Sequence, residues 1–304
     1  MKTNALYYGD NLDMLREHVP DDAVDLVYLD PPFNSNRDYN VIFKDESGRQ
    51  SDSQILAFED TWHWGPKAEA TLAYLTTTHR HRGRVPSGVS TLVDALVSGI
   101  GKNQMMAYLV EMTVRLVELH RVLKPTGSLY LHCDPTASHY LKVVLDAIFG
   151  ARFFRGEITW KRSHAHSDGK QGRKGYGNVA DILLYYTKSD IYTFNTQYLP
   201  YEQAYIDKYY RYRDADGRRF WLDNLTGPGG AAKGNPKYEV LGVTRYWRYS
   251  QDRMRELIAR GRVVQTKPGN VPQFKRYLDE MPGVPLQNIW TDIPPINMMA
   301  RERL

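Results

Sequence analysis

The sequence predicts an α/β protein with a doubly wound, mostly parallel sheet. Short apolar stretches that favour strands alternate along the chain with amphipathic stretches that favour helices, as in folds built on parallel sheets. One apolar stretch, residues 24–29, ends at an aspartate followed by two prolines, which cannot continue a sheet ladder. With 304 residues, 42% of them hydrophobic, the chain is long enough for one large α/β domain and a smaller module.

The first elements can be assigned from their apolar spacing. Residues 4–8 (NALYY) are predicted to form a strand. Residues 11–18 are predicted to form a short helix with two leucines on one face. Residues 24–29 (VDLVYL) are rich in residues that favour strands, and they predict a buried strand whose carboxyl end is Asp30. Ligands of open α/β sheets bind at that edge, so Asp30 is a candidate site residue.

The middle of the chain continues the alternation after a long insertion. Residues 34–104 are polar and lack a regular pattern, so they are predicted to form a long loop inserted in the domain. The clearest helix covers residues 103–123, where methionine and leucine recur at every third or fourth position. The remaining predicted elements are a strand at 128–134, a helix at 137–149, and strands at 153–161 and 182–187.

The residues that follow the strand at 24–29 suit recognition of a flat ring that carries an amino group. The Asp30 carboxylate can accept a hydrogen bond from an exocyclic amine, and the carbonyls of Asp30, Pro31 and Pro32 are further acceptors. Phe33 can stack on the ring. Together these groups suit a nucleobase turned out of a duplex. The alternative interpretation is a strand that ends in an ordinary Asp-Pro turn.

The stretch Asp30-Pro31-Pro32-Phe33 resembles motif IV of the DNA amino-methyltransferases, which methylate adenine N6 or cytosine N4 with S-adenosylmethionine. The resemblance implies a Rossmann-like methyltransferase fold in which these four residues are catalytic. It also implies that Asp10, Asp30 and Pro31 bind the cofactor, although Asp10 is an equally good N-cap for the helix that follows it. Adenine N6 is favoured as the target because Asp-Pro-Pro is commoner among adenine enzymes, and cytosine N4 is the alternative.

The order of the motifs resembles the permuted β arrangement of this family, in which motif IV lies near the N-terminus. Members of that group continue from a Trp-x-Asp segment, here Trp290-Thr291-Asp292, into a Gly-rich cofactor motif that this sequence lacks. The resemblance therefore implies a sheet that is incomplete at the C-terminus and a motif IV strand with an exposed apolar edge. A DNA-recognition fragment without catalysis is the alternative function. The expected division is a catalytic core at 1–198, a target-recognition region at 199–287 and a returning segment at 288–304.

Two basic stretches are candidates for contact with DNA phosphates. The net charge of +5 permits binding to nucleic acid. In residues 161–176, lysine and arginine outnumber acidic residues five to one, and residues 78–84 form a run of histidine and arginine. For both stretches the alternative is a solvated charged surface. The predicted DNA-binding residues are Arg80, Arg82, Lys161, Arg162, His164, Lys170, Arg173 and Lys174.

The region after residue 199 interleaves arginine with aromatic residues, as expected of a surface that reads bases and phosphates. Four of its tyrosines have helical spacing, which favours a packed stripe over base contact. They are Tyr201, Tyr205, Tyr209 and Tyr212.

Composition excludes several other kinds of protein. Cys133 is the only cysteine, which excludes an internal disulfide and a cysteine-based zinc site and fits a reducing cytoplasm. We expect no metal site, no membrane span and no signal peptide. From the resemblance, the expected partners are double-stranded DNA and either a restriction subunit or a second copy of the chain.

Overall fold

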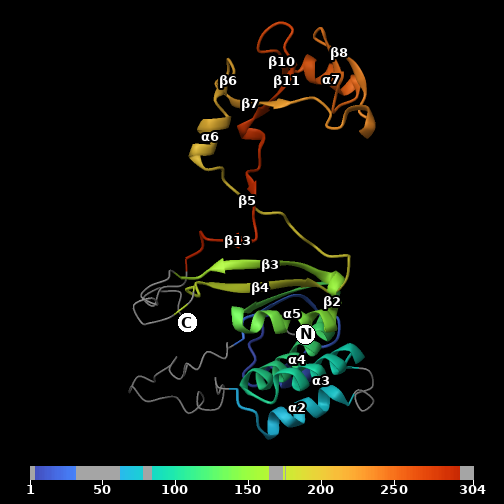
Figure 1. The fold of residues 1–304 in the computed structure, drawn as a ribbon, viewed down its shortest axis with the longest axis vertical. Coiled ribbons are helices and arrows are strands. Elements are labelled where there is room, and N and C mark those ends of the chain that lie inside the picture. The colour runs from blue at the N-terminus through green and yellow to red at the C-terminus, as the bar shows by residue number, and fades with distance from the viewer. Residues whose placement is uncertain (1–3, 32–61, 78–83, 164–173, 175, 295–304) are drawn as a thin grey trace. The chain divides into compact units, whose positions relative to one another are not determined.

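The structure is a computed structural model that describes residues 4–31, 62–77, 84–163, 174 and 176–294. The chain divides into two compact units (Figure 1), unit 1 with residues 1–194 and 287–304 and unit 2 with residues 195–286. The roles predicted for these regions in catalysis and in target recognition stay predictions. No helix in the described part of the chain is long and apolar enough to cross a membrane.

Unit 1 is built on a five-stranded sheet with the order β1-β2-β4-β3-β13. β1 is parallel to β2 and β13 is parallel to β3, whereas β4 is antiparallel to both of its neighbours. β4 therefore runs against the other strands, and the predicted α/β class with a mostly parallel sheet is confirmed. The strands are β1 (Val24–Leu29), β2 (Leu123–Cys133), β3 (Phe154–Lys161), β4 (Ala180–Thr187) and β13 (Ile289–Trp290).

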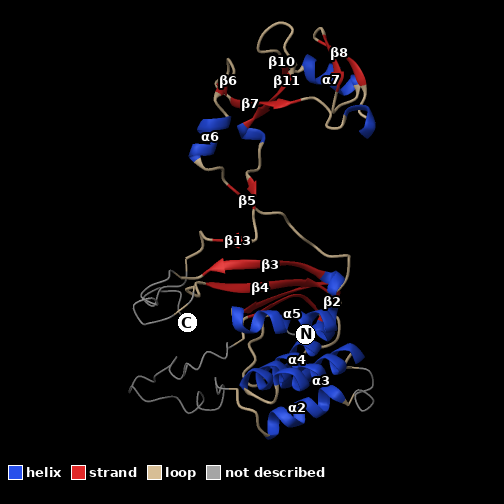
Figure 2. Ribbon diagram, in the orientation of Figure 1, coloured by secondary structure: helices blue, strands red, loops and turns tan. Residues whose placement is uncertain are grey.

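The helices of unit 1 pack together, and in Figure 2 α2 to α5 lie on one side of the sheet. α4 lies at the centre of this layer, since most of its residues are buried, including the charged Glu111, Arg115 and Glu118. Leu129 and Leu131 of β2 and Leu184 and Tyr186 of β4 belong to the same hydrophobic core. The helices are α1 (Asn11–His18), α2 (Pro66–Thr76), α3 (Ser87–Ile100), α4 (Gln104–Val122) and α5 (Pro135–Phe149).

A row of tyrosines lies on the other face of the sheet. Tyr28, Tyr130 and Tyr185 pair across β1, β2 and β4, and the rings of Tyr130 and Tyr185 stack with centroids 4.4 Å apart. Tyr28 and Leu26, on the same face of β1, are each 58% exposed, and β1 is an edge strand of the described sheet. That β1 has lost a neighbouring strand stays a prediction.

Most of the predicted elements of unit 1 are confirmed to within two residues. α1 and β1 have the predicted bounds, and α4, α5, β3 and β4 differ from prediction only at their ends. Side-chain caps set two of the helix starts, since Asn103 accepts from the amide of Met106 and Asp134 accepts from the amide of Ala137. β2 begins earlier than predicted, at Leu123, because the segment expected to stop α4 is already extended.

Two predictions about unit 1 are wrong. Residues 4–8 do not form a strand, and Leu6 is 99% exposed. No described strand lies beside this stretch, and a strand is stable only when it is paired. The predicted loop at 34–104 contains α2 and α3 in its described part. Their apolar residues, among them Leu72 and Leu75 of α2 and Val89, Leu92 and Val93 of α3, recur at helical spacing and pack on α4 and on the other helix.

Unit 2 has its own hydrophobic core around Trp247. Trp247 is fully buried among Leu225, Val240 and Met254, and its indole N–H donates to the carbonyl of Tyr238 at 2.8 Å. A four-stranded antiparallel sheet has the order β10-β11-β7-β6, and β8-β9 and β5-β12 form separate pairs. The elements are β5 (Tyr198–Leu199), α6 (Gln203–Tyr209), β6 (Tyr212–Arg213), β7 (Arg219–Asn224), β8 (Lys237–Val240), β9 (Val243–Tyr246), α7 (Gln251–Ala259), β10 (Val263–Val264), β11 (Gln273–Tyr277) and β12 (Val284–Pro285).

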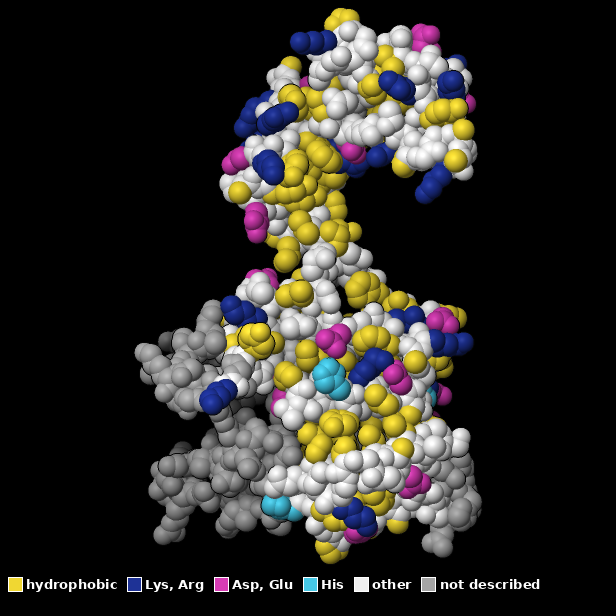
Figure 3. Space-filling model, in the orientation of Figure 1, with side chains coloured by type: hydrophobic (Ala, Val, Ile, Leu, Met, Phe, Trp, Pro, Cys, Tyr) yellow, Lys and Arg dark blue, Asp and Glu magenta, His cyan; other side chains and the backbone are white. Residues whose placement is uncertain are grey.

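The predicted buried stripe of tyrosines is wrong. Tyr201, Tyr205 and Tyr209 do stack on one another, but Tyr205 and Tyr209 are more than one third exposed. α6 is too short to hold all four rings, so Tyr212 lies on β6, and the buried ring is Tyr210. Figure 3 shows hydrophobic side chains gathered beside α6 on the face that it draws.

Candidate active site

Asp30 lies at the carboxyl end of β1, the edge at which open α/β sheets bind ligands. Its side chain is 56% exposed, whereas the next residue, Pro31, is buried. The chain therefore leaves the strand through a packed proline of fixed φ, and the carboxylate before it stays at the surface. Pro32 and Phe33 lie outside the described residues, so their catalytic roles stay predictions.

His132 and Asp181, from the next two strands of the sheet, lie beside Asp30. Leu29 pairs with Leu131 in parallel register, so the residues that follow them, Asp30 and His132, come to the same level. His132 Nδ1 is 3.0 Å from Asp30 Oδ1, and His132 Nε2 is 3.3 Å from Asp181 Oδ2. Asp181 Oδ1 is 2.8 Å from Arg162 Nε. We call Asp30, His132, Asp181 and Arg162 the charge row.

The middle of the charge row is buried and its two ends are open. The side chains of His132 and Asp181 are only 8% and 5% exposed, whereas that of Arg162 is 41% exposed. Burial alone would lower the pKa of His132, but hydrogen bonds and charges from Asp181 and Asp30 outweigh it and raise the pKa to about 9. The imidazole ring therefore carries a charge at neutral pH, and the signs alternate along the row.

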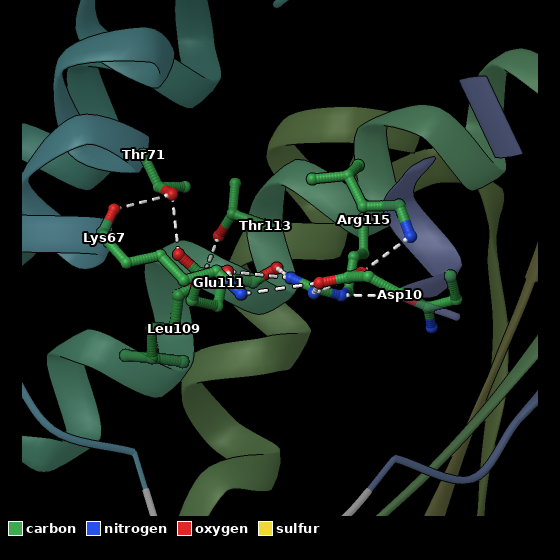
Figure 4. Close-up of polar contacts among 9 residues, drawn as sticks. Asp10, Lys67, Thr71, Leu109, Glu111, Thr113 and Arg115 are labelled. Carbon is green, nitrogen blue, oxygen red and sulfur yellow. Dashed lines mark hydrogen bonds and ion pairs between the residues drawn. The ribbon is translucent and has the colours of Figure 1, made fainter. Parts of the chain in front are cut away.

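Asp10, the other predicted cofactor residue, belongs to a separate ion-pair network (Figure 4). Asp10 Oδ1 accepts from the amide of Leu12 at 2.9 Å, so Asp10 is the N-cap of α1. Arg115 Nη2 donates to both carboxylate oxygens of Asp10, at 2.8 and 2.9 Å, and Lys67 lies 3.4 Å away. Burial would raise the pKa of Asp10, but the Leu12 amide and the charges of Arg115 and Lys67 hold it below its usual value. The N-cap role is confirmed, and the cofactor role stays a prediction.

Glu111 completes this network from inside α4. Its carboxylate accepts from Arg115 Nη1 at 2.9 Å and from the hydroxyl of Thr71 at 2.6 Å. The side chains of Glu111 and Arg115 are almost fully buried, so α1, α2 and α4 are joined by charges within the hydrophobic layer. Such charges are stable in the interior only when they are paired and hydrogen-bonded, as they are here.

Of the predicted DNA-binding residues, the structure describes Lys161, Arg162 and Lys174. Lys161 ends β3, Arg162 follows it and is paired with Asp181, and Lys174 is exposed. Their DNA contacts stay predictions. The other predicted DNA-binding residues lie outside the described residues: Arg80, Arg82, His164, Lys170 and Arg173.

Sequence reasoning did not assign roles to His132, Asp181 or Arg115. For Asp181 one local signal exists, because an aspartate at the start of the apolar strand 180–187 is unusual unless it has a partner. The partner itself depends on the strand register, which the sequence does not reveal. Within the described residues, no group of three or more His, Cys, Asp or Glu side chains could hold a metal ion.

Comparison with known proteins identifies the family. The chain matches the family model N6_N4_Mtase, described as DNA methylase, over residues 24–291. It is 26% identical over 303 residues to the Mod subunit of the type III restriction-modification enzyme StyLTI of Salmonella typhimurium, and the aligned residues cover 95% of this chain and 41% of that protein. It is 28% identical over 189 residues to the type II methyltransferase M.EcaI of Enterobacter cloacae, and the aligned residues cover 61% of this chain and 41% of that protein.

The chain thus spans about two fifths of the length of these curated relatives. Among solved structures, the cytosine-N4-specific PvuII DNA methyltransferase aligns with a TM-score of 0.36 and 10% identity, over 63% of this chain and 51% of that one. The family match, in contrast, covers most of the chain and includes β1, Asp30 and the whole charge row. The protein therefore belongs to the N6_N4_Mtase family of DNA methylases.

Proposed function

We propose that this chain carries the target-base site of a site-specific DNA methyltransferase that methylates adenine at N6, with S-adenosylmethionine as the methyl donor. The observation that carries the proposal is the Asp30 carboxylate, which is exposed at the carboxyl end of β1 and which the described residues contact on Oδ1 alone. The family match supports DNA methylation as the reaction class. The presence of Asp-Pro-Pro supports adenine over cytosine.

Asp30 would act on the amino group of the base by position and charge. Its Oδ1 is next to His132, and its Oδ2 has no partner among the described residues. That oxygen can accept an N–H of the base amine, which turns the nitrogen lone pair toward the methyl carbon. S-adenosylmethionine, when bound, supplies the methyl group. The carboxylate also stabilises the positive charge that develops on the amine nitrogen and can take the proton that the nitrogen must lose.

The described residues fit the base better than the cofactor. Asp30 is half-exposed at the carboxyl end of β1, and its Oδ2, which has no partner among the described residues, is available to a ligand. Asp10 differs, because the Leu12 amide, Arg115 and Lys67 already make four contacts to its two oxygens, about as many as a carboxylate accepts. We therefore assign the methyl-transfer position to Asp30 and Pro31, and a lesser role in cofactor binding to Asp10.

We propose double-stranded DNA as the substrate, with Lys161 and Lys174 among the residues that contact its phosphates. The StyLTI relative is by name a subunit of a restriction-modification enzyme, so a restriction subunit is the partner that we propose for this chain, with a second copy of the chain as the alternative. We propose the cytoplasm as its location, since Cys133 is a free buried thiol.

The test is a methyl-transfer assay with radiolabelled S-adenosylmethionine and mixed-sequence DNA, followed by mass spectrometry of the nucleosides. We expect N6-methyldeoxyadenosine from the unaltered chain and none from Asp30→Ala. Asp25→Ala is the matched control, because Asp25 is an exposed carboxylate on the same strand that pairs only with Lys124 among the described residues. Undiminished transfer by Asp30→Ala would refute the assignment, and N4-methyldeoxycytidine as the product would refute the choice of adenine.

A DNA-recognition fragment without catalysis is the second candidate, and the arginine and aromatic residues interleaved after residue 199 support it. Calorimetric titration with S-adenosylmethionine separates the two. Micromolar binding supports the enzyme, and DNA binding without cofactor binding supports the fragment.

A further inference from the structure

We infer that His132 is a positioning residue for Asp30: its imidazole ring holds one carboxylate oxygen and leaves the other to receive the amino group of the target base. The inference rests on the proposed function, because it assigns a partner to the residue that the proposed reaction uses. It concerns a residue of β2 that lies outside the Asp-Pro-Pro-Phe stretch.

The sheet itself brings the three acid and base groups together. Asp30 follows β1, His132 lies near the end of β2, and Asp181 lies near the start of β4, so three adjacent strands contribute one residue each. β4 runs against β2, which brings its first residues to the level of the last residues of β2. The reversed strand is therefore what places a carboxylate on the far side of His132.

Burial makes this arrangement specific. His132 and Asp181 are almost fully buried, and a buried charge costs several kcal/mol unless opposite charges or hydrogen bonds compensate for it. A neutral imidazole donates from only one ring nitrogen, whereas His132 has a carboxylate oxygen near each of its two nitrogens. The geometry therefore suits a doubly protonated ring, and Arg162 balances the charge of Asp181.

Trp160 restrains the ring from the side of β3. It packs edge-on against His132 with centroids 5.9 Å apart, and its own indole N–H donates to the carbonyl of Ile293 at 2.8 Å. The described charged groups that face His132 are thus Asp30 from the end of β1 and Asp181 from β4, and Arg162 lies beside Asp181 rather than beside the ring.

The consequence for the reaction concerns the exposed end of the row. A half-exposed aspartate has free rotation about its side-chain bonds, and this freedom weakens its ability to orient a substrate amine. The contact with His132 at 3.0 Å removes much of that freedom. A carboxylate oxygen held in one orientation can accept a hydrogen bond from the amine during methyl transfer.

The first test needs no activity and uses the whole chain with labelled histidine in an NMR pH titration. We expect one histidine with a pKa well above 6.5, and we expect Asp30→Asn and Asp181→Asn each to lower it by about one unit. Asp30 is exposed, so its substitution leaves the fold intact. His120 is the internal control, because burial lowers its pKa to about 4 and Asp30 does not contribute to that shift. A His132 pKa that Asp30→Asn leaves unchanged would overturn the inference.

The second test compares His132→Asn with His132→Gln in methyl transfer. The amide of asparagine places a donor near the position of Nδ1, toward Asp30, whereas that of glutamine places it near the position of Nε2, toward Asp181. We expect kcat to fall at least about tenfold in His132→Gln and clearly less in His132→Asn, with KM for DNA within about twofold of the unaltered chain in both. Equal losses of kcat in the two variants, or losses in KM alone, would show a structural role and overturn the inference.

The outcomes separate this inference from the proposed function. If Asp30→Ala still methylates DNA, the proposed function fails, whatever the titration shows. If Asp30→Ala abolishes transfer while both His132 variants keep full kcat, the function stands and the inference fails. If the unaltered chain transfers no methyl group, the titration alone decides whether His132 holds Asp30.

Discussion

Replacement of Arg115 by methionine should destabilise unit 1 by about 3 kcal/mol. Arg115 connects Asp10, at the start of α1, with Glu111 inside α4, and the side chains of Arg115 and Glu111 are only 9% and 3% exposed. Removal of one partner from a buried ion pair costs about 3–5 kcal/mol, because the other charge stays buried without compensation.

The structure places the expected value at the lower end of that range. Without Arg115, Glu111 keeps its hydrogen bond from Thr71 at 2.6 Å, and Lys67 lies 4.0 Å away. Asp10 keeps the amide of Leu12 and is partly exposed, so water can solvate it. The double variant Glu111→Leu with Arg115→Met removes both buried charges and should recover most of the lost stability.

Cys133 provides an assay that reports on unit 1 alone, because it is the only cysteine and lies fully buried on β2. Burial and the nearby carboxylates of Asp134, Glu157 and Asp181 raise the pKa of its thiol to about 12, so the folded chain should react with thiol reagents only when unit 1 opens. When closing is faster than labelling, the rate follows the opening equilibrium, and 3 kcal/mol corresponds to an increase of about 10²-fold.

Lys124→Met is the matched control for Arg115→Met. Lys124 pairs with Asp25, but both side chains are largely exposed, so its loss should cost less than about 1 kcal/mol and change labelling by less than about fivefold. If Arg115→Met accelerates labelling no more than this control, the buried network does not stabilise the helical layer and the reasoning is refuted.

Three further predictions follow from other parts of the structure. Because the pKa of His132 is raised from 6.5 to about 9, the stability that its charge contributes is complete below pH 6.5 and is lost as the pH rises through about 9. The rate of Cys133 labelling, corrected for thiol ionisation, should therefore increase over that pH range in the unaltered chain but not in His132→Gln. Identical pH profiles of the two proteins would contradict this prediction. Trp247→Ala should cost unit 2 about 3–5 kcal/mol, seen as faster hydrogen exchange in peptides that cover its core, and unchanged exchange would contradict the central place of Trp247 in that core. Gly283 has a φ of +115°, and a Cβ there would collide with the carbonyl of Leu199, so Gly283→Ala should disrupt the pairing of β5 with β12. The amide of Leu286, which donates to the carbonyl of Gln197, should then lose its protection from hydrogen exchange. Full protection of that amide in the variant would refute the strain argument.

The elements that sequence reasoning predicted correctly are those whose pattern is local. β1 is a short run of strand-forming residues that ends at two prolines, and α4 repeats its apolar residues over five turns, so neither needs information from elsewhere in the chain. Residues 4–8 have an equally good local pattern but no described neighbour, and local pattern cannot supply one. α2 and α3 show the converse, because the apolar residues of α3 recur at helical spacing in the sequence, yet the polar character of the surrounding segment led to the prediction of a loop.

In the candidate site, too, the sequence predicted what depends on local residues and missed what depends on strand pairing. The position of Asp30 at a strand end follows from the sequence around it, whereas its contact with His132 depends on the parallel register of β1 and β2. The contact of His132 with Asp181 depends on the reversed direction of β4, which an alternation of strands and helices does not indicate. Arg115 was hidden because a stripe of methionine and leucine identified the helix without showing that the stripe surrounds a buried ion pair.

The two aspartates predicted to bind the cofactor show how the partner decides what a carboxylate can do. Arginine presents several donors, and Arg115 uses Nη2 on both oxygens of Asp10 and Nη1 on Glu111, so that it joins the two carboxylates. The two nitrogens of histidine face opposite ways, so His132 Nδ1 lies 3.0 Å from one oxygen of Asp30 while Nε2 faces Asp181. The first arrangement consumes the hydrogen-bonding capacity of the carboxylate and stabilises the fold. The second orients the carboxylate and preserves an acceptor, which is why Asp30 rather than Asp10 is the residue that we expect to meet the substrate amine.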